Sequence, residues 1–221
     1  MIVAIDGPAG SGKSSTAREV ARRLGFHHVD SGAFYRAVTW TALETGLPEE
    51  RWAALDAAAL DGMRIGAVPV AHGFRMEVDG RDVSREIREP RVNAHVSAIA
   101  RLPAVRDWLR QRMHGLRDND LVIDGRDIGT VVFPDAEVKV FLVADPEARA
   151  RRRLAETGVL APSTDDVAAE VERLLARDRA DSEREVAPLR RADDAVQLDT
   201  TGLGFDEQVE RVIELVRSAR A

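Results

Sequence analysis

Short apolar runs alternate along this chain with longer stretches whose apolar residues recur at helical spacing. The runs have the length and composition of strands buried in a parallel sheet, and they lie at about residues 2–5, 27–30, 121–124, 137–143 and 195–198. The helical patterns lie at about 13–24, 33–45, 49–60, 89–116, 146–156, 165–187 and 205–219, and Pro103 is expected to divide the fourth of them. This alternation predicts an α/β fold with a doubly wound, five-stranded parallel sheet flanked by helices.

The segment at about residues 62–84 follows a different pattern. Apolar and charged residues alternate along Phe74–Val78, which predicts a half-buried strand. Asp79-Gly80 follows directly and is a pair typical of hairpin turns. We therefore expect a small antiparallel β insertion on the parallel core.

Composition narrows the class of protein. Of the 221 residues, 44% are hydrophobic, which is ordinary for a folded domain and too high for a disordered chain. No run approaches the ~18 apolar residues of a membrane-spanning helix. The absence of cysteine removes disulfides, zinc–thiolate sites and thiol nucleophiles, and a net charge of −6 argues against a nucleic-acid partner. The start, MIVAIDGPAG, has no basic region or cleavage site of a secretory leader, so we expect a cytoplasmic protein.

A phosphate-binding motif follows the first predicted strand. The pattern G-x-x-x-x-G-K-[ST] is made by Gly7, Pro8, Ala9, Gly10, Ser11, Gly12, Lys13 and Ser14, with Ser15 next. Its glycines let backbone N–H groups turn toward a phosphate, and the helix that follows adds partial positive charge at its N-terminus. Lys13 can reach the β- and γ-phosphates of a nucleotide, and the Ser14 hydroxyl can bind Mg²⁺. The motif predicts binding of ATP or a similar triphosphate.

Other motifs decide among the classes that share this loop. The chain has two lysines, Lys13 and Lys139, against thirty arginines, and Lys139 lies in Val-Lys-Val. The Asn-Lys-x-Asp motif with which GTPases read guanine is therefore absent. A transporter-type signature is also absent, as is a strand ending in Asp-Glu of the kind found in motor ATPases. These features favour a kinase that acts on a small metabolite.

Polar residues follow two of the predicted strands. Ser31 is expected to cap the helix after the second strand, and Arg36 lies on that helix, so the two could hold an acceptor phosphate. An ordinary capped helix remains an alternative. The segment Asp124–Thr130 ends a central strand on the side of the phosphate loop, which is a functional position in this architecture, although a solvated turn is also possible.

A third set of polar residues has helical spacing. Arg177, Asp181 and Arg184 are placed at i, i+4 and i+7, so they share one face of the helix predicted at 165–187. Without other information, such a face is more often an exposed ladder of ion pairs.

Together the motifs are specific. The chain resembles bacterial cytidylate kinases in IDGPAGSGKSS, VDSGAFYR, GRDVSREIR, DGRDIGTVVFP and RDRADSEREVAPL, which occur in the same order over essentially its whole length. The resemblance implies a single domain over 1–221, with an acceptor-side insertion at about 62–100 and a lid at about 149–164. It implies transfer of the ATP γ-phosphoryl group to CMP or dCMP, with Mg²⁺. We expect nucleotide partners only, no membrane partner, and a monomer.

The resemblance also implies roles for residues at matching positions. Residues 7–15 and the lid residues Arg152 and Arg153 would bind ATP, with Mg²⁺ on Ser14. The transfer path and acceptor phosphate would be lined by Lys13, Ser31, Arg36, Arg126, Arg177 and Arg184. The cytosine would face Ser97, Arg106 and Asp127, and the sugar would face Asp181 with Arg177.

Two rival functions remain open from the sequence. One is another kinase of the same fold, of the UMP/CMP, adenylate or shikimate type, in which the acceptor-binding segment is usually smaller or helical. The antiparallel insertion favours the bacterial cytidylate type. The other is a regulator that holds ATP without turnover, against which the retained Lys13, Ser14 and arginine array argue.

Overall fold

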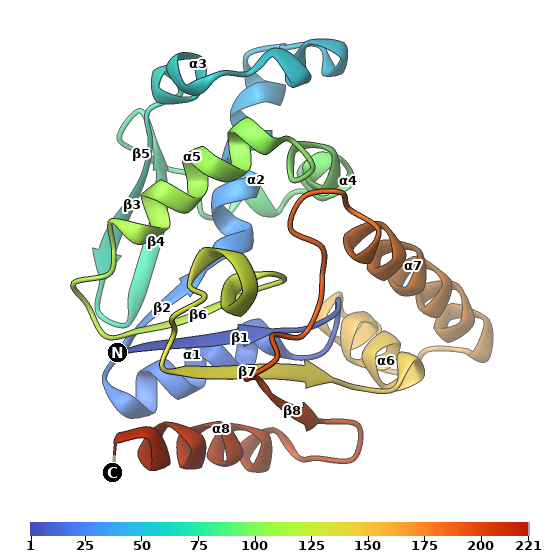
Figure 1. Ribbon diagram of the computed structural model, residues 1–221. Coiled ribbons are helices and arrows are strands. Elements are labelled where there is room, and N and C mark those ends of the chain that lie inside the picture. Colours follow the sequence, from blue (N-terminus) through green and yellow to red (C-terminus); the bar gives the residue numbers. More distant parts are fainter. Residues whose placement is uncertain (221) are drawn as a thin grey trace.

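A computed structural model describes residues 1–220 as one sheet covered by helices (Figure 1). The strands are β1 Ile2–Asp6, β2 His27–Asp30, β3 Ile65–Val70, β4 Gly73–Val78, β5 Arg81–Asp82, β6 Leu121–Gly125, β7 Val138–Val143 and β8 Val196–Asp199. The α-helices are α1 Lys13–Leu24, α2 Ser31–Glu44, α3 Ala57–Gly62, α4 Pro90–Ile99, α5 Pro103–His114, α6 Pro146–Glu156, α7 Thr164–Ser182 and α8 Phe205–Arg220. Two 3₁₀ turns, Glu49–Ala54 and Glu86–Arg88, and a π-helical turn, Ile128–Val132, complete the regular structure.

The strand order confirms the predicted doubly wound core. Five parallel strands lie in the order β2-β6-β1-β7-β8, so β1 is central. The chain passes from β1 to β2 on one side, returns to β6 between them, and then continues to β7 and β8 on the other side. Open sheets of this kind bind ligands outside the carboxyl ends of the strands, where the direction of winding reverses. The phosphate-binding loop follows β1 at that point.

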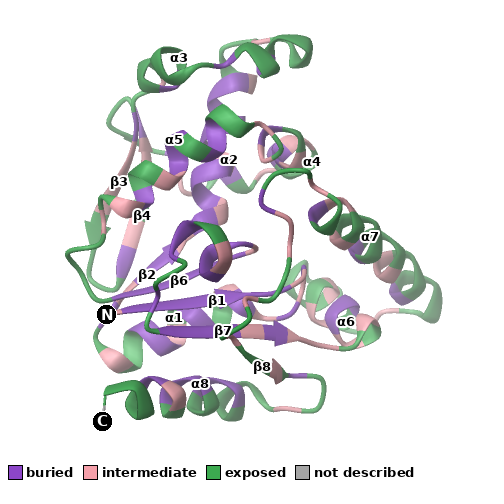
Figure 2. Cartoon of the chain, viewed as in Figure 1, coloured by how far each residue is buried: buried purple, intermediate pink, exposed green. Residues whose placement is uncertain are grey.

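Each face of the central strands packs into its own core. On β1, Val3 and Ile5 lie against α1 and α8, whereas Ile2 and Ala4 lie against the helices of the opposite face. Both faces are therefore buried, which explains why β1 is apolar from Ile2 to Ile5 rather than alternating (Figure 2). Among residues 1–220, no helix is both long and apolar enough to cross a lipid bilayer.

The predicted antiparallel insertion is present, and it extends the main sheet. β3 and β4 pair antiparallel, β5 returns along β4, and Asp79 and Gly80 form the turn between them with φ of 53° and 75°. The sequence pattern did not show that β4 also joins β2, in parallel, through His28 and Gly73. This join is close, since a Cβ on Gly73 would lie 2.9 Å from the His28 carbonyl oxygen.

Two predicted helices differ from the structure. The stretch at 49–60 is a 3₁₀ turn followed by the short α3, because Leu55 is extended and the Asp56 side chain caps a new helix by accepting from Ala59 N at 2.9 Å. The helix predicted to reach residue 187 ends at Ser182, so Arg184 follows the helix instead of extending its face. Pro103 divides the 89–116 stretch as predicted, at the first position of α5.

The predicted lid lies on α6 and the loop that leads to α7. These two helices pack against each other, and Ala150, Val167 and Leu174 form a small core of their own that includes Ala9 of the phosphate-binding loop. The segment predicted as a lid is thus packed directly against the phosphate-binding loop.

Candidate active site

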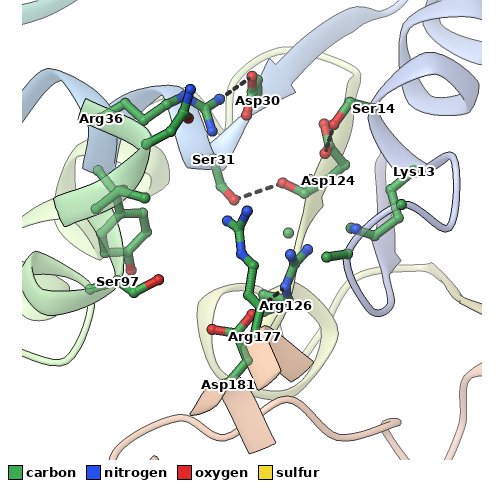
Figure 3. Close-up of a pocket in the computed structure, with 18 of the residues that line it drawn as sticks. Lys13, Ser14, Asp30, Ser31, Arg36, Ser97, Asp124, Arg126, Arg177 and Asp181 are labelled. Carbon is green, nitrogen blue, oxygen red and sulfur yellow. Dashed lines mark hydrogen bonds and ion pairs between the residues drawn. The ribbon is translucent and has the colours of Figure 1, made fainter. Parts of the chain in front are cut away.

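One cavity of about 700 Å³ opens above the carboxyl ends of β1, β2 and β6. Its walls come from the phosphate-binding loop, the start of α2, α4, the turn after β6, the lid and the end of α7. Figure 3 shows labelled side chains of the loop, α2, α4, the end of β6 and α7 around this space. Sixteen of the residues predicted for the site line it: Ala9, Gly10, Gly12, Lys13, Ser14, Ser15, Ser31, Arg36, Ser97, Arg106, Arg126, Asp127, Arg153, Arg177, Asp181 and Arg184.

The phosphate-binding loop requires glycine at two positions, Gly7 and Gly12. A Cβ on Gly7 would lie 2.2 Å from the carbonyl oxygen of Leu142 on β7, and Gly12 has φ of 88° just before α1. Lys13 folds back and donates from Nζ to the Pro8 carbonyl at 2.8 Å. The loop backbone is therefore held as a cradle at the N-terminus of a helix, a geometry that favours phosphate.

Lys13 is buried among other cations. Burial, and then the charge of Arg126, lower the pKa of Lys13 to about 7. Burial and the same arginine also lower the pKa of Arg177, which opens on the cavity but is surrounded by protein, to about 10. This end of the cavity carries a positive charge that an anion such as a polyphosphate would stabilise.

Asp124, at the end of β6, faces Ser14 across the floor of the cavity. The Ser14 hydroxyl donates to Asp124 Oδ2 at 2.5 Å, and His28 Nε2 lies 2.8 Å from Asp124 Oδ1. The Ser31 hydroxyl donates to the Asp124 carbonyl at 2.7 Å. One hydroxyl and one carboxylate therefore lie together beside the loop, and oxygen atoms of these types are the ligands Mg²⁺ prefers.

Asp6 lies below the loop and holds the turn after β6. Its carboxylate accepts from Ile128 N at 2.9 Å and Gly129 N at 2.7 Å. Burial raises the pKa of Asp6 to about 7 despite these two hydrogen bonds. The contact fixes the segment that carries Arg126 and Asp127 relative to the end of β1.

The start of α2 corrects one prediction. Asp30, not Ser31, caps the helix, by accepting from Ala33 N at 3.1 Å. Asp30 Oδ2 also accepts from Arg36 at 2.7 Å and from Arg88 of the insertion at 2.8 Å. Burial opposes ionisation of this carboxyl, but the two guanidinium groups hold its pKa below the ordinary range.

Arg106 and Asp127 form a buried ion pair at the far end of the cavity. Arg106 Nη2 donates to Asp127 Oδ2, and Arg106 Nη1 donates to the Ala100 carbonyl at 2.9 Å. Both side chains are about 6% exposed. The pair presents a carboxylate next to a guanidinium, which is a combination of acceptor and donor suited to the edge of a base.

Arg126 connects the two ends of the cavity. Its Nε donates to Asp181 Oδ2 at 2.8 Å and its Nη1 to the Gly7 carbonyl at 3.2 Å. Within residues 1–220, Arg36 Nε and Arg184 Nη2 are buried without a hydrogen-bond partner. These donors point to an anionic ligand between the loop and the Arg106–Asp127 pair.

The two arginines predicted to contact ATP from the lid lie in different places. Arg153 lines the cavity, whereas Arg152 lies outside its walls and donates to Thr200, which follows β8. Thr200 is buried and its hydroxyl in turn reaches the Ser11 carbonyl at 3.4 Å. Three residues of the loop also lie outside the lining of the cavity: Gly7, Pro8 and Ser11.

Sequence reasoning missed several residues of the site. Asp30, Arg88 and Asp124 line the cavity but were not among the predicted binding residues, and His28 contacts Asp124 from below. Asp30 and Asp124 carried a signal, because each ends a predicted strand at the edge where ligands bind. Arg88 closes the motif GRDVSREIR, but the motif was assigned no role at this residue. His28 carried no signal that the sequence alone could separate from a core residue.

Comparisons with known proteins identify the same family as the sequence motifs do. The family model described as cytidylate kinase matches residues 3–218. A cytidylate kinase of Chlorobaculum tepidum is 48% identical, over 98% of this chain and 92% of its own, and one of Streptomyces griseus is 44% identical over 100% and 94%. The crystal structure of TT1252 from Thermus thermophilus covers 100% of this chain and 98% of its own with a TM-score of 0.51, at 22% identity, which shows the shared fold alone. The resemblance predicted from the motifs is confirmed, and the chain belongs to the cytidylate kinase family.

Proposed function

We propose that this protein transfers the γ-phosphoryl group of ATP to CMP or dCMP, giving ADP and CDP or dCDP. The observation that carries the proposal is the single cavity with the phosphate-binding loop at one end and the Arg106–Asp127 pair at the other. Cations from four segments line the space between them. A cavity of this kind suits two nucleotides that meet phosphate to phosphate.

The charges in the cavity suit the reaction's main obstacle. A monophosphate oxygen is already anionic, so the acceptor needs no general base, but it must approach an equally anionic triphosphate. Lys13, Arg36, Arg126, Arg177 and Arg184 would neutralise the phosphates and hold them in line. Because most of these groups are enclosed by protein, each acts in a medium where charges interact more strongly than in water.

The residues present fit a magnesium ion. Within residues 1–220, no cluster of three or more His, Cys, Asp or Glu side chains could hold a metal ion by itself. Mg²⁺ in kinases is usually bound by one or two protein oxygens together with phosphate oxygens of the nucleotide. Ser14 and Asp124 would supply the protein oxygens here. When bound, Mg²⁺ supplies positive charge to the phosphates during transfer.

The base end of the cavity suits cytosine. Cytosine presents an N4 amino donor beside its N3 and O2 acceptors, whereas uracil presents an O4 acceptor beside an N3 donor. Asp127 would accept from N4 and Arg106 would donate to N3 or O2, with Ser97 beside them. With UMP, the carboxylate would face an acceptor and would be left unpaired in a buried place. Asp181 with Arg177 would contact the sugar.

The proposal is tested by ADP release in a coupled assay with ATP and Mg²⁺, using CMP, dCMP, UMP, AMP and shikimate in parallel. We expect fast turnover with CMP and dCMP and little with the rest, and loss of roughly 10²–10⁴ in rate for Lys13→Ala. Turnover with UMP or AMP instead would retain a kinase but contradict the base contacts. ATP binding with no turnover on any acceptor would favour a regulator.

The base contact has its own control. Asp127→Asn should lower the ratio of kcat/KM for CMP over UMP by roughly tenfold or more, because the amide can donate to O4. Asp181→Asn changes another buried carboxylate of the same cavity that would face the sugar, so both acceptors should lose activity equally. An unchanged ratio in Asp127→Asn would show that another residue discriminates the bases.

A further inference from the structure

His28 is a buried polar residue with no role in the contacts proposed so far. It lies in the middle of β2, and its side chain is 9% exposed. Its Nε2 lies 2.8 Å from Asp124 Oδ1 on the neighbouring strand β6. A carboxylate accepts hydrogen bonds and donates none, so Nε2 carries the proton in this contact.

The contact completes the hydrogen bonding of the Asp124 carboxylate. Asp124 Oδ2 is bound by the Ser14 hydroxyl, and within residues 1–220 the recorded partner of Oδ1 is His28. Asp124 is 3% exposed, so an oxygen that lost its donor would gain little from solvent. The carboxylate would then be free to rotate about its terminal bond, and the oxygen facing Ser14 would no longer be fixed.

The backbone of His28 is also anchored. It forms the join between β2 and the insertion, since His28 N donates to the His72 carbonyl at 3.1 Å and Gly73 pairs with it in register. The imidazole therefore projects from a rigid point of the sheet. A hydrogen-bond donor anchored in this way can hold a carboxylate in one orientation.

We propose that His28 is a positioning residue that orients Asp124 for the metal held with Ser14. The inference rests on the proposed function, because it assigns Mg²⁺ to Ser14 and Asp124. His28 touches neither the nucleotides nor the ion; it acts through the Asp124 carboxylate alone. Residues that orient metal ligands in this way typically change metal affinity or activity by about 10–100-fold when they are replaced.

The experiment compares ATP binding by calorimetry with Mg²⁺ and with EDTA, in the absence of an acceptor. His28→Leu removes the donor at similar volume, and His28→Gln places an amide N–H near the position of Nε2. His27→Leu is the matched control, because His27 is the neighbour on the same strand and its ring instead lies tilted beside that of Phe74, with centroids 5.6 Å apart. Melting temperatures show whether each variant is folded.

We expect the gain in ATP affinity on adding Mg²⁺ to fall about tenfold in His28→Leu, while the affinity in EDTA changes less than about twofold. His28→Gln should recover most of the gain, and His27→Leu should keep all of it. Equal gains in His28→Leu and wild type would overturn the proposal, as would a loss in His28→Leu that Gln does not recover.

A turnover assay with CMP on the same protein samples separates this inference from the proposed function. If wild-type protein turns over no CMP, the proposed function fails whatever the variants do. If wild type is active and His28→Leu binds Mg²⁺ and ATP as wild type does, the positioning role alone is wrong.

Discussion

Lys13 differs from the thirty arginines of this chain in a way that matters at its position. A buried ammonium can lose its proton near neutral pH, whereas a guanidinium stays charged. Burial and the charge of Arg126 lower the pKa of Lys13 to about 7. A bound polyphosphate would neutralise the neighbouring cations and so stabilise the charged form of Lys13. Binding of ATP should therefore raise the pKa of Lys13 again.

This shift predicts proton uptake. Above pH 7 Lys13 is mostly neutral in the free protein and charged in the complex, so ATP binding at pH 8 should take up roughly one proton, and ATP affinity should fall as pH rises from 7 to 9. Calorimetry in two buffers of different ionisation enthalpy measures the number. Lys13→Arg, which keeps the charge at every pH, should take up almost none. Equal uptake by the variant would place the proton elsewhere.

At the scale of elements, the start of α2 is organised around a glycine. A Cβ on Gly32 would lie 2.9 Å from Arg36 Nη1 and 3.1 Å from Asp30 Oδ1. The Arg36 guanidinium therefore lies directly over the first turn of the helix, where it can share an acceptor phosphate with the helix N-terminus. An added methyl group would displace this flexible side chain, and it would also press on Asp30 Oδ1, which caps the helix by accepting from Ala33 N.

Gly32→Ala should thus raise KM for CMP by about tenfold, the loss of about one charge-assisted hydrogen bond, and leave KM for ATP unchanged. Gly62→Ala is the matched control, since Gly62 also lies in a helix but a Cβ there meets nothing within 4 Å. Steady-state kinetics with each substrate varied in turn measures the effect. An unchanged KM for CMP in Gly32→Ala would remove Arg36 from the acceptor contacts.

The two neighbouring arginines of α6 predict opposite results. Arg153 lines the cavity, so Arg153→Ala should raise KM for ATP several-fold and leave the melting temperature within about a degree. Arg152 donates to Thr200 behind the loop, so Arg152→Ala should lower the melting temperature by a few degrees. Thermal melts and ATP kinetics on both variants measure this contrast. The reverse pattern would indicate that Arg152 contacts the nucleotide, as the family resemblance implied.

These elements also show which parts of the fold and site the sequence could predict. The central strands β1, β6 and β7 could be predicted because most of their residues are apolar and buried. The loop residues could be predicted because the phosphate cradle needs fixed residue types at fixed spacing. The helix at 49–60 was wrong because one capping side chain, Asp56, outweighed the apolar pattern. His28 and Arg88 were missed because their partners lie 96 and 58 residues away along the chain.

The positive side chains of the cavity contrast with the net negative charge of the whole molecule. The chain carries a net charge of −6, yet one cavity gathers Lys13 and several arginines. The insertion reaches this cavity through Arg88 and the lid through Arg153, so these two segments meet at the carboxyl ends of the central strands. The phosphates of two bound nucleotides would neutralise the positive side chains that the loop, α2, the insertion, the turn after β6, the lid and α7 contribute to the cavity.

The most direct test is therefore binding of a bisubstrate analogue in which adenosine and cytidine are joined by five phosphates. One molecule per chain should bind, should compete with both ATP and CMP, and should bind far more tightly than the analogue that carries adenosine at both ends. Competition with ATP alone, or two molecules bound per chain, would contradict the single continuous cavity from which the proposed function is argued.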